Sequence, residues 1–211
     1  MRTKTLLLSA ATVVAGALAA QAQSNVFSAN VVGYVNVPLS ANNFYLAATP
    51  LNAPTNDLNT LLTALPVKSS VQIWNGAGFT PANKGAGGWS PNFTVPPGTG
   101  YFISSPSAVT NPFVGSVVVG FGGSVTNALP AGLFQLVGSP IPFNGTLNDP
   151  NLGLTALPNK SSVQVWNGNG FTPSNKGAGG WSPDLPIIPG QGFFVTSATA
   201  TNWVQTLPAT P

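Results

Sequence analysis

Lys68-Ser-Ser-Val-Gln-Ile-Trp-Asn-Gly-Ala-Gly-Phe-Thr-Pro-Ala-Asn-Lys-Gly-Ala-Gly-Gly-Trp-Ser-Pro91 is a stretch that this chain carries twice, because residues 160–183 repeat it with three substitutions. Aligning residues 62–105 with residues 154–197 gives 31 identities in 44 positions. One structural unit has therefore been duplicated, and any site that the unit carries should occur twice.

The repeat extends outward from this block. Residues 31–34 (Val-Val-Gly-Tyr) correspond to residues 118–121 (Val-Val-Gly-Phe), and residues 44–50 correspond to residues 134–140. We therefore expect three parts: a signal peptide over 1–22, a first β repeat over 23–117 and a second β repeat over 118–211. Two tandem repeats of about 90 residues predict two lobes related by pseudo-twofold symmetry.

Short β-branched and aromatic runs, set between many of the 21 Pro and 24 Gly residues, predict an all-β fold with one short helix per repeat. Val71–Phe79 predicts a β-hairpin, because Asn75-Gly76 tolerates the positive φ angles of a tight turn. A long loop over 80–97 should follow, and then an apolar strand over 98–105. Earlier in each unit we expect two further strands, at 31–37 and 44–48 in the first repeat and at 117–121 and 134–137 in the second.

The helix of each repeat has a recognisable start. Asp57 precedes Leu58 and Leu61 at helical spacing, and Asp149 precedes Pro150, which is favoured at the first helical position. An Asp side chain at this place accepts hydrogen bonds from amide groups that the helix leaves unpaired. We therefore interpret both carboxylates as helix caps in preference to catalytic groups.

The join between the repeats has no linker composition. Residues 114–121 (Val-Gly-Ser-Val-Val-Val-Gly-Phe) are β-branched and uncharged, which predicts a strand. A buried strand shared by both lobes is the favoured interpretation. The alternative is an exposed edge strand, which would be prone to pair with another chain.

Several of these patterns also carry a resemblance. They are Asn30-Val-Val-Gly-Tyr-Val-Asn-Val37, Leu136-Val-Gly-Ser-Pro-Ile-Pro142, the Val-Gln-x-Trp-Asn-Gly hairpin and the Pro-Gly-x-Gly-Phe-Phe-Val strand. In them the chain resembles uncharacterised exported two-repeat β proteins of environmental bacteria of the planctomycete and verrucomicrobial kind. The resemblance covers nearly all of the chain after residue 22. It implies the β fold and export, and it assigns no functional residues.

The first 22 residues have the pattern of an export signal. Arg2 and Lys4 precede an apolar run over 6–20, and Ala20-Gln21-Ala22 is a small-x-small cleavage site. We predict cleavage after Ala22 and export to the extracellular space, the cell surface or the periplasm. The apolar run is shorter than the roughly 20 residues that span a bilayer as a helix, so we expect no membrane span.

Charge is scarce in this chain. Charged residues make up 4% of it, and after residue 22 four Lys against three Asp give 4 − 3 = +1. Four lysines cannot form the phosphate-neutralising surface of a nucleic-acid-binding protein, so we exclude nucleic acid as a partner. A surface with little charge repulsion favours association with a polysaccharide, with a cell-surface matrix or with other copies of the chain.

The residue types that usually carry catalysis are missing. The chain has no His, Cys or Glu, which excludes Ser-His-Asp and Cys-His nucleophile systems and the usual zinc ligands. Asp184 stands where the first repeat has Asn92, so the unit does not require a carboxylate there. No loop is rich enough in Asp for calcium. The sequence predicts a protein without enzymatic activity, cofactor or metal.

Neutral side chains are the remaining candidates for a binding site. Aromatic faces can stack on the apolar face of a neutral sugar, and Asn or Gln amides can bind its hydroxyls. Trp89 follows a glycine-rich loop, where a ring could be exposed, whereas Trp74 shares a strand face with Gln72. The opposing interpretation is core or interlobe packing, which we favour for Trp74 and its counterpart. The candidate ligand-binding residues are Trp89, Trp181, Trp74, Trp166, Asn83 and Asn175.

Together these features predict a secreted, non-enzymatic structural or interaction protein of the cell exterior. The alternative is a carbohydrate-binding module that uses paired tryptophan platforms.

Overall fold

The computed structural model describes residues 32–209, and this part of the chain is mainly β, as predicted. The predicted signal peptide lies outside the described residues. The strands up to residue 116 are β1 (Val32–Leu39), β2 (Phe44–Ala48), β3 (Ser70–Trp74), β4 (Phe79–Gly85), β5 (Gly88–Ser90), β6 (Gly100–Ser104) and β7 (Val109–Ser116). The later strands are β8 (Ser124–Leu129), β9 (Gln135–Gly138), β10 (Gly145–Thr146), β11 (Ser162–Trp166), β12 (Phe171–Gly177), β13 (Gly180–Ser182), β14 (Pro186–Ile187), β15 (Gly192–Thr196) and β16 (Thr201–Thr206).

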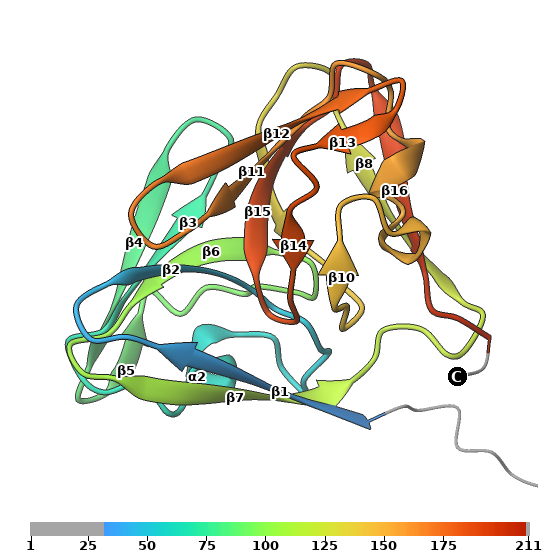
Figure 1. The fold of residues 1–211 in the computed structure, drawn as a ribbon. Helices are drawn as coiled ribbons and strands as arrows, with labels where there is room; N and C mark the ends of the chain where they lie inside the picture. Colours follow the sequence, from blue (N-terminus) through green and yellow to red (C-terminus); the bar gives the residue numbers. More distant parts are fainter. Residues whose placement is uncertain (1–31, 210–211) are drawn as a thin grey trace, which may run out of the picture.

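The strands before and after the join pair in the same order. The first five-stranded antiparallel sheet has the order β2-β6-β3-β4-β5, and the second has the order β9-β15-β11-β12-β13. Each lobe adds a two-stranded ribbon, β1–β7 or β8–β16, and β10 pairs with β14. Figure 1 shows the ribbon β1–β7 along the bottom and β8–β16 at the right, with the two larger sheets between them.

Each lobe has its own hydrophobic core between its larger sheet and its ribbon. The first core is built only from residues 35–117 and the second only from residues 129–203. Typical members are Val37, Val71 and Phe113 in the first core and Leu129, Val163 and Trp203 in the second. A third, smaller cluster joins the lobes and contains Leu46, Phe102, Leu136 and Phe194. The larger sheets therefore bury side chains on both faces.

Strand β6 illustrates how one sheet contributes to two cores. Successive side chains of a strand point to opposite faces. Tyr101 and Ile103 accordingly belong to the first lobe's core, whereas Phe102 between them belongs to the interlobe cluster. A continuous apolar run is the expected sequence for a strand that is covered on both sides.

Backbone contacts between the lobes are reciprocal. The Ala48 amide donates to the Gly190 carbonyl at 2.9 Å, and the Gly138 amide donates to the Gly98 carbonyl at 3.0 Å. These residues occupy corresponding positions in the alignment of the two repeats. Gly192 permits this approach, because a Cβ atom there would lie 2.6 Å from the Ala47 carbonyl oxygen. Pseudo-twofold symmetry stays a prediction, which these paired contacts support.

The join between the repeats differs from the prediction. Strand β7 ends at Ser116 and β8 begins at Ser124, so no continuous strand is shared by the lobes, and the strand expected at 117–121 is absent. The reason is a turn: the Gly123 amide donates to the Gly120 carbonyl at 2.9 Å, and Gly122 has φ of 76°. Glycine adopts this left-handed conformation without steric cost, so the chain turns here and the β-branched residues do not continue as a strand.

The long loop expected over 80–97 is also wrong in its first half. Strand β4 continues to Gly85, and β5 pairs with it through a tight turn at Ala86 and Gly87. Gly88, with φ of 106°, allows this turn. The glycine-rich stretch is therefore the end of a second hairpin.

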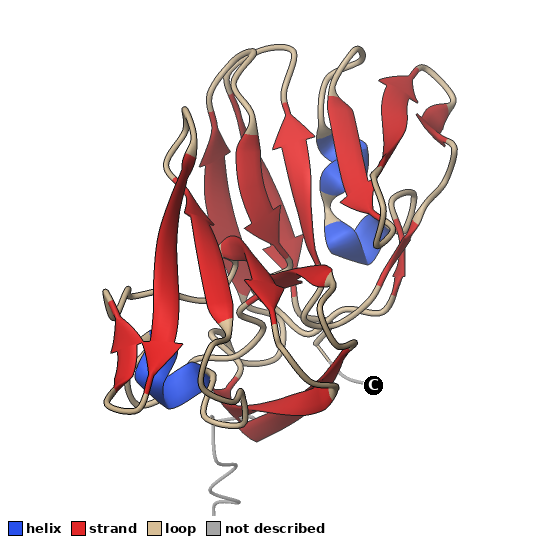
Figure 2. Cartoon of the chain, turned by 90° about the vertical axis from the view of Figure 1, so that its left-hand side faces the viewer, coloured by secondary structure: helices blue, strands red, loops and turns tan. Residues whose placement is uncertain are grey.

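The helical caps are confirmed. The Asp57 carboxylate accepts a hydrogen bond from the Thr60 amide at 2.9 Å at the start of α2 (Leu58–Leu61), and this bond holds the pKa of Asp57 below its usual value. Asp149 caps η1 (Pro150–Leu152), which is followed by η2 (Leu154–Ala156). Figure 2 shows the helical segments in blue among the strands, on opposite sides of the molecule. Among residues 32–209, no helix has the length and apolar character needed to cross a bilayer.

Candidate binding site

Trp89 and Trp181 are not exposed platforms. Their side chains are 4% and 3% accessible, and each belongs to the core of its own lobe. The backbone amides of both residues donate to a side-chain oxygen in or near the helical segment, Trp89 to Asn59 at 2.8 Å and Trp181 to Asn148 at 2.7 Å. A sugar ring cannot stack on a buried indole, so the expectation of exposed rings here is wrong.

Asn83 and Asn175 are exposed, as a binding role would require, but they do not face these tryptophans. Lys84 pairs with Trp89 across β4 and β5, and Asn83 is the next residue along the strand. Because neighbouring side chains alternate, Asn83 lies on the opposite face from Trp89. It shares that face with Gln72 and Trp74 of the adjacent strand β3.

That shared face carries a cluster of aromatic rings, which we name the aromatic seam. It consists of four rings from each repeat and lies where the two larger sheets meet. Its members are Phe44, Trp74, Phe79 and Phe102 from the first repeat and Phe134, Trp166, Phe171 and Phe194 from the second.

The ring contacts of the seam occur in matching pairs. The Trp74–Phe79 and Trp166–Phe171 centroids are both 5.0 Å apart, and the Phe44–Phe102 and Phe134–Phe194 centroids are both 6.0 Å apart. The contacts between repeats match too, at 5.5 Å for Trp74–Phe194 and 5.4 Å for Phe102–Trp166. Most of the pairs are edge-to-face, the arrangement that the ring quadrupoles favour.

The indole N–H groups of the seam bind the other repeat. Trp74 Nε1 donates to the Phe134 carbonyl at 3.1 Å, and Trp166 Nε1 donates to the Phe44 carbonyl at 2.9 Å. Both rings are half-buried. The interlobe packing that we favoured for these two tryptophans is what their contacts describe.

Local sequence explains why the rings of a hairpin meet. Trp74 and Phe79 are directly opposite each other at the ends of β3 and β4. The turn between them is closed by Asn75, whose side-chain oxygen accepts from the amides of Ala77 at 3.0 Å and Gly78 at 2.8 Å. The second repeat has the same turn at Asn167, with amide bonds of 3.0 and 2.9 Å. Each hairpin therefore holds one Trp–Phe pair on the seam.

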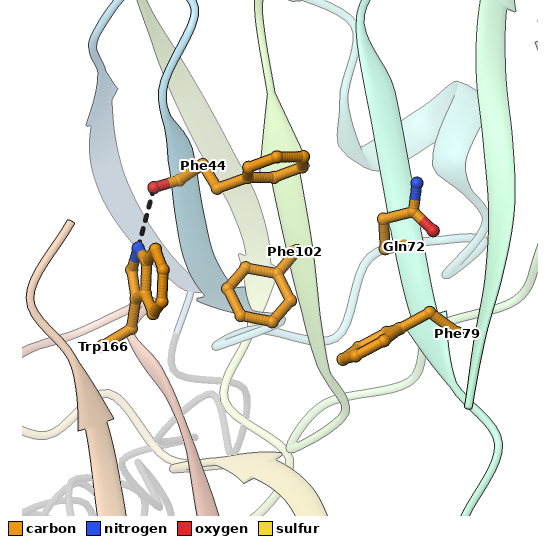
Figure 3. Close-up of a pocket in the computed structure, with 5 residues that line it drawn as sticks. All are labelled: Phe44, Gln72, Phe79, Phe102 and Trp166. Carbon is orange, nitrogen blue, oxygen red and sulfur yellow. Dashed lines mark hydrogen bonds between the residues drawn. The ribbon is translucent and has the colours of Figure 1, made fainter. Parts of the chain in front are cut away.

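The seam encloses two pockets of the same composition. The first, of about 230 Å³, is lined by Phe44, Gln72, Phe79, Phe102 and Trp166. The second, of about 160 Å³, is lined by the corresponding residues Phe134, Gln164, Phe171, Phe194 and Trp74. Figure 3 shows the first pocket, with the Trp166 indole bonded to the Phe44 carbonyl and the phenyl rings facing the hollow. Each pocket thus takes four residues from one repeat and its tryptophan from the other.

The seam is only partly covered. Phe102 and Phe194 are buried, whereas the other four phenylalanines keep 38–48% of their surface accessible. These four are Phe44, Phe79, Phe134 and Phe171. A soluble protein rarely exposes several large aromatic side chains together, and such surfaces usually mark binding sites.

Each pocket contains one polar side chain, a glutamine. Gln72 lines the first pocket and Gln164 the second, and neither amide makes a side-chain hydrogen bond to a residue of the described chain. Among residues 32–209, no charged residue lines either pocket. The nearest titratable neighbour in sequence is Tyr45, and burial raises its pKa to about 12. The site is therefore neutral at physiological pH.

The three carboxylates of the chain lie elsewhere and bind backbone. Asp57 and Asp149 cap helical segments, and Asp184 accepts from the Asn148 amide at 3.0 Å. In the first repeat the Asn92 side chain makes the same bond to the Asn59 amide, also at 3.0 Å. Within the described residues, no cluster of three His, Cys, Asp or Glu side chains is present that could hold a metal ion.

Sequence reasoning found two of the seam residues, Trp74 and Trp166, and missed the six phenylalanines. A signal was present: Phe44, Phe79 and Phe102 all have a phenylalanine at the corresponding position of the second repeat. What the sequence could not supply was the docking of the two sheets, which brings the tryptophan of one repeat onto the phenylalanines of the other.

Comparisons of this chain with protein-family models, with curated proteins and with solved structures found no significant match, so its site is interpreted from its own geometry.

Proposed function

We propose that this chain is a non-enzymatic interaction protein of the cell exterior and that it binds its partner through the aromatic seam. The observation that carries the proposal is the partial exposure of four phenylalanines around two apolar pockets. Leaving this surface in water forgoes about 25 cal/mol for each Å² of apolar area. A partner that covers the rings gains this free energy on binding.

The absence of reactive groups supports a binding role over catalysis. The pockets offer rings and one amide each, without a carboxylate, imidazole or thiol for proton transfer or nucleophilic attack. All three Asp side chains already accept hydrogen bonds from backbone amides. These groups stabilise the fold and lie outside the seam.

The location is proposed from residues 1–22, whose basic start, apolar run and Ala-Gln-Ala end have the pattern of an export signal. Without cysteine the chain forms no disulfide, so outside the cytoplasm its stability would rest on its hydrophobic cores. We propose that the exported chain acts outside the cytoplasm as part of a cell-surface matrix or in contact with one.

The test is binding to a panel of uncharged partners, read by tryptophan fluorescence and by co-sedimentation. The panel contains neutral polysaccharides, a polyproline peptide and vesicles of a zwitterionic lipid. We expect saturable binding to one class, with a change in emission from the seam tryptophans. The double variant Phe44→Ser/Phe134→Ser should lose it, whereas Tyr34→Ser, which removes an exposed aromatic ring of β1 remote from the pockets, should keep it. Binding that the double variant retains would refute the seam as the surface.

Self-association is a second candidate function, and a different surface favours it. The outer face of the ribbon β1–β7 exposes Val32, Tyr34 and Val114, and Tyr34 is directly opposite Val114. The corresponding ribbon β8–β16 pairs Thr126 with Val204 and is more polar. Sedimentation of the wild-type chain and of Tyr34→Ser/Val114→Thr tests this candidate: a dimer that the variant loses supports it, and a wild-type monomer at all concentrations excludes it.

A further inference from the structure

We infer that the two pockets of the aromatic seam are equivalent half-sites for one neutral polysaccharide chain, each taking a separate stretch of the same polymer. This inference rests on the proposed function and names its partner. It depends on the chemistry of the pocket walls, on the glutamine in each pocket, on the lack of charged residues among the described residues that line the pockets and on the duplication.

The walls suit the apolar face of a sugar ring. A neutral pyranose has one face made largely of C–H groups, and covering that face with aromatic carbon removes apolar surface from water. The first pocket provides four aromatic rings around about 230 Å³, and the second provides four around about 160 Å³. Its opening lets hydroxyls on the ring's edge stay hydrated, as the exposure of Phe44 and Phe79 indicates.

The glutamine supplies what the rings lack. An amide offers both a donor and an acceptor, so it can bind a hydroxyl in either role. Binding sites for small neutral groups commonly combine apolar walls with a few such polar groups. Gln72 and Gln164 lie at corresponding positions and have no side-chain hydrogen bond to the described chain that a ligand would have to break.

Other partner classes fit these observations less well. An acidic polymer would need a Lys or Arg near the pockets, and none lines them. Proline-rich peptides dock in aromatic grooves, where their carbonyls need donors from the groove. The indole N–H groups of Trp74 and Trp166 are already bonded to carbonyls of the other repeat.

The duplication favours a partner made of repeating units. The two pockets are lined by the same residue types. Their walls are in contact, because the ring centroids of Phe79 and Phe194 are 6.5 Å apart and those of Phe102 and Phe171 are 6.2 Å apart. A homopolymer presents identical units to both pockets. Two linked contacts can raise avidity by about 10²–10⁴ over one contact.

Stoichiometry and chain length test the inference. By titration calorimetry on the full exported chain, a short neutral oligosaccharide should bind at two sites, and the matching long polysaccharide should bind at least tenfold more tightly per chain. The probes are trimers and polymers of β-glucan, xylan and mannan, with alginate as the charged control. The single variants Phe44→Ser and Phe134→Ser should each reduce the number of oligosaccharide sites from two to one. Each should also lower polymer affinity by tenfold or more.

A second variant separates sugar binding from general apolar binding. Gln72→Leu/Gln164→Leu should weaken oligosaccharide binding by roughly five- to tenfold, the value of one hydrogen bond, and leave binding of an apolar dye unchanged. Equal effects on both probes would overturn the assigned role of the amides. Retained thermal stability of the variant serves as the folding control.

The outcomes distinguish this inference from the proposed function. Binding of the polyproline peptide or of vesicles through the seam, with no neutral polysaccharide bound, overturns the inference and leaves the proposed function standing. One oligosaccharide site in the wild type, or equal affinity for trimer and polymer, overturns the two-half-site arrangement. Binding of alginate in preference to the neutral polymers overturns the argument from charge.

Discussion

The two pairs of repeated tryptophans lie in opposite environments. Trp89 and Trp181 lie in the lobe cores, whereas Trp74 and Trp166 lie half-exposed on the seam, where their N–H groups bond to the other repeat. Both pairs occur in the same repeated block, so the residue composition around them does not distinguish a core tryptophan from a seam tryptophan. The strand face distinguishes them. Trp89 of β5 points into the core of its own lobe, whereas Trp74 of β3 points toward the other lobe. A tryptophan in a small β unit is therefore best interpreted from its strand face.

Removing a core tryptophan should have the largest effect. Trp181→Ala deletes a buried indole and its hydrogen bond to the Leu154 carbonyl. We expect a loss of about 3–5 kcal/mol in the free energy of unfolding, measured by urea denaturation. If Trp181→Ala lowered the free energy of unfolding by less than Trp166→Ala does, the contrast between core and seam tryptophans would be wrong.

Removing a seam tryptophan should cost less. Trp166→Ala removes a half-buried ring and one interlobe hydrogen bond, so we expect a loss of about 1–3 kcal/mol. The same variant should open the first pocket, which Trp166 lines. Urea denaturation and dye binding measure the two effects, and Trp74→Ala is the matched variant for the second pocket.

The core pair itself contains an asymmetry that sharpens the comparison. Trp181 Nε1 donates to Leu154 at 3.2 Å, but Trp89 Nε1 is buried with no partner in the described chain. The Leu62 carbonyl, which corresponds to Leu154, is instead bound by Lys84 Nζ at 2.9 Å.

Trp→Phe substitution should expose this difference. Trp181→Phe leaves a buried carbonyl without its donor and should cost about 1–2 kcal/mol more than Trp89→Phe, which removes an unsatisfied donor. Parallel urea titrations of the two variants give the value. Equal costs would mean that the Trp89 indole finds a partner in solution.

The smallest effect concerns pH. The Thr60 amide bond holds the folded-state pKa of Asp57 below its unfolded value, so its stabilisation is present above about pH 4, the unfolded pKa, and is lost as pH falls through the folded pKa. Asp57→Asn should therefore lower the stability slightly near pH 7 and flatten its dependence on pH below pH 4, as measured by urea denaturation at a series of pH values. The seam has no titrating group, and its fluorescence should stay constant from pH 5 to 9.

Much of the fold was predictable because the local signals are strong. The hairpin at Asn75-Gly76, both Asp caps and the strands at 44–48 and 98–105 follow from turn chemistry and alternation. The predictions failed where glycine interrupts β-branched runs, at 117–123, and where a strand is polar and short, at 88–90. Propensity cannot distinguish these cases, because pairing with a neighbouring strand decides them.

The candidate binding site was predictable only in part, for a different reason. Half of its residues lie on one repeat and half on the other, and no periodicity in either repeat encodes how two sheets dock. The correspondence of Phe44, Phe79 and Phe102 with phenylalanines of the second repeat marked the surface. The reciprocal indole hydrogen bonds hold each tryptophan against the other repeat, where it lines that repeat's pocket.

The sharing of pocket walls has a consequence for the unit before it was duplicated. Because each pocket needs the tryptophan of the other repeat, a single repeat contains no complete pocket. Two identical copies that met as the lobes do would form an isologous dimer. In such a dimer, each indole hydrogen bond from the first copy to the second is matched by one from the second copy to the first. Fusion of the copies into one chain makes pocket assembly independent of protein concentration.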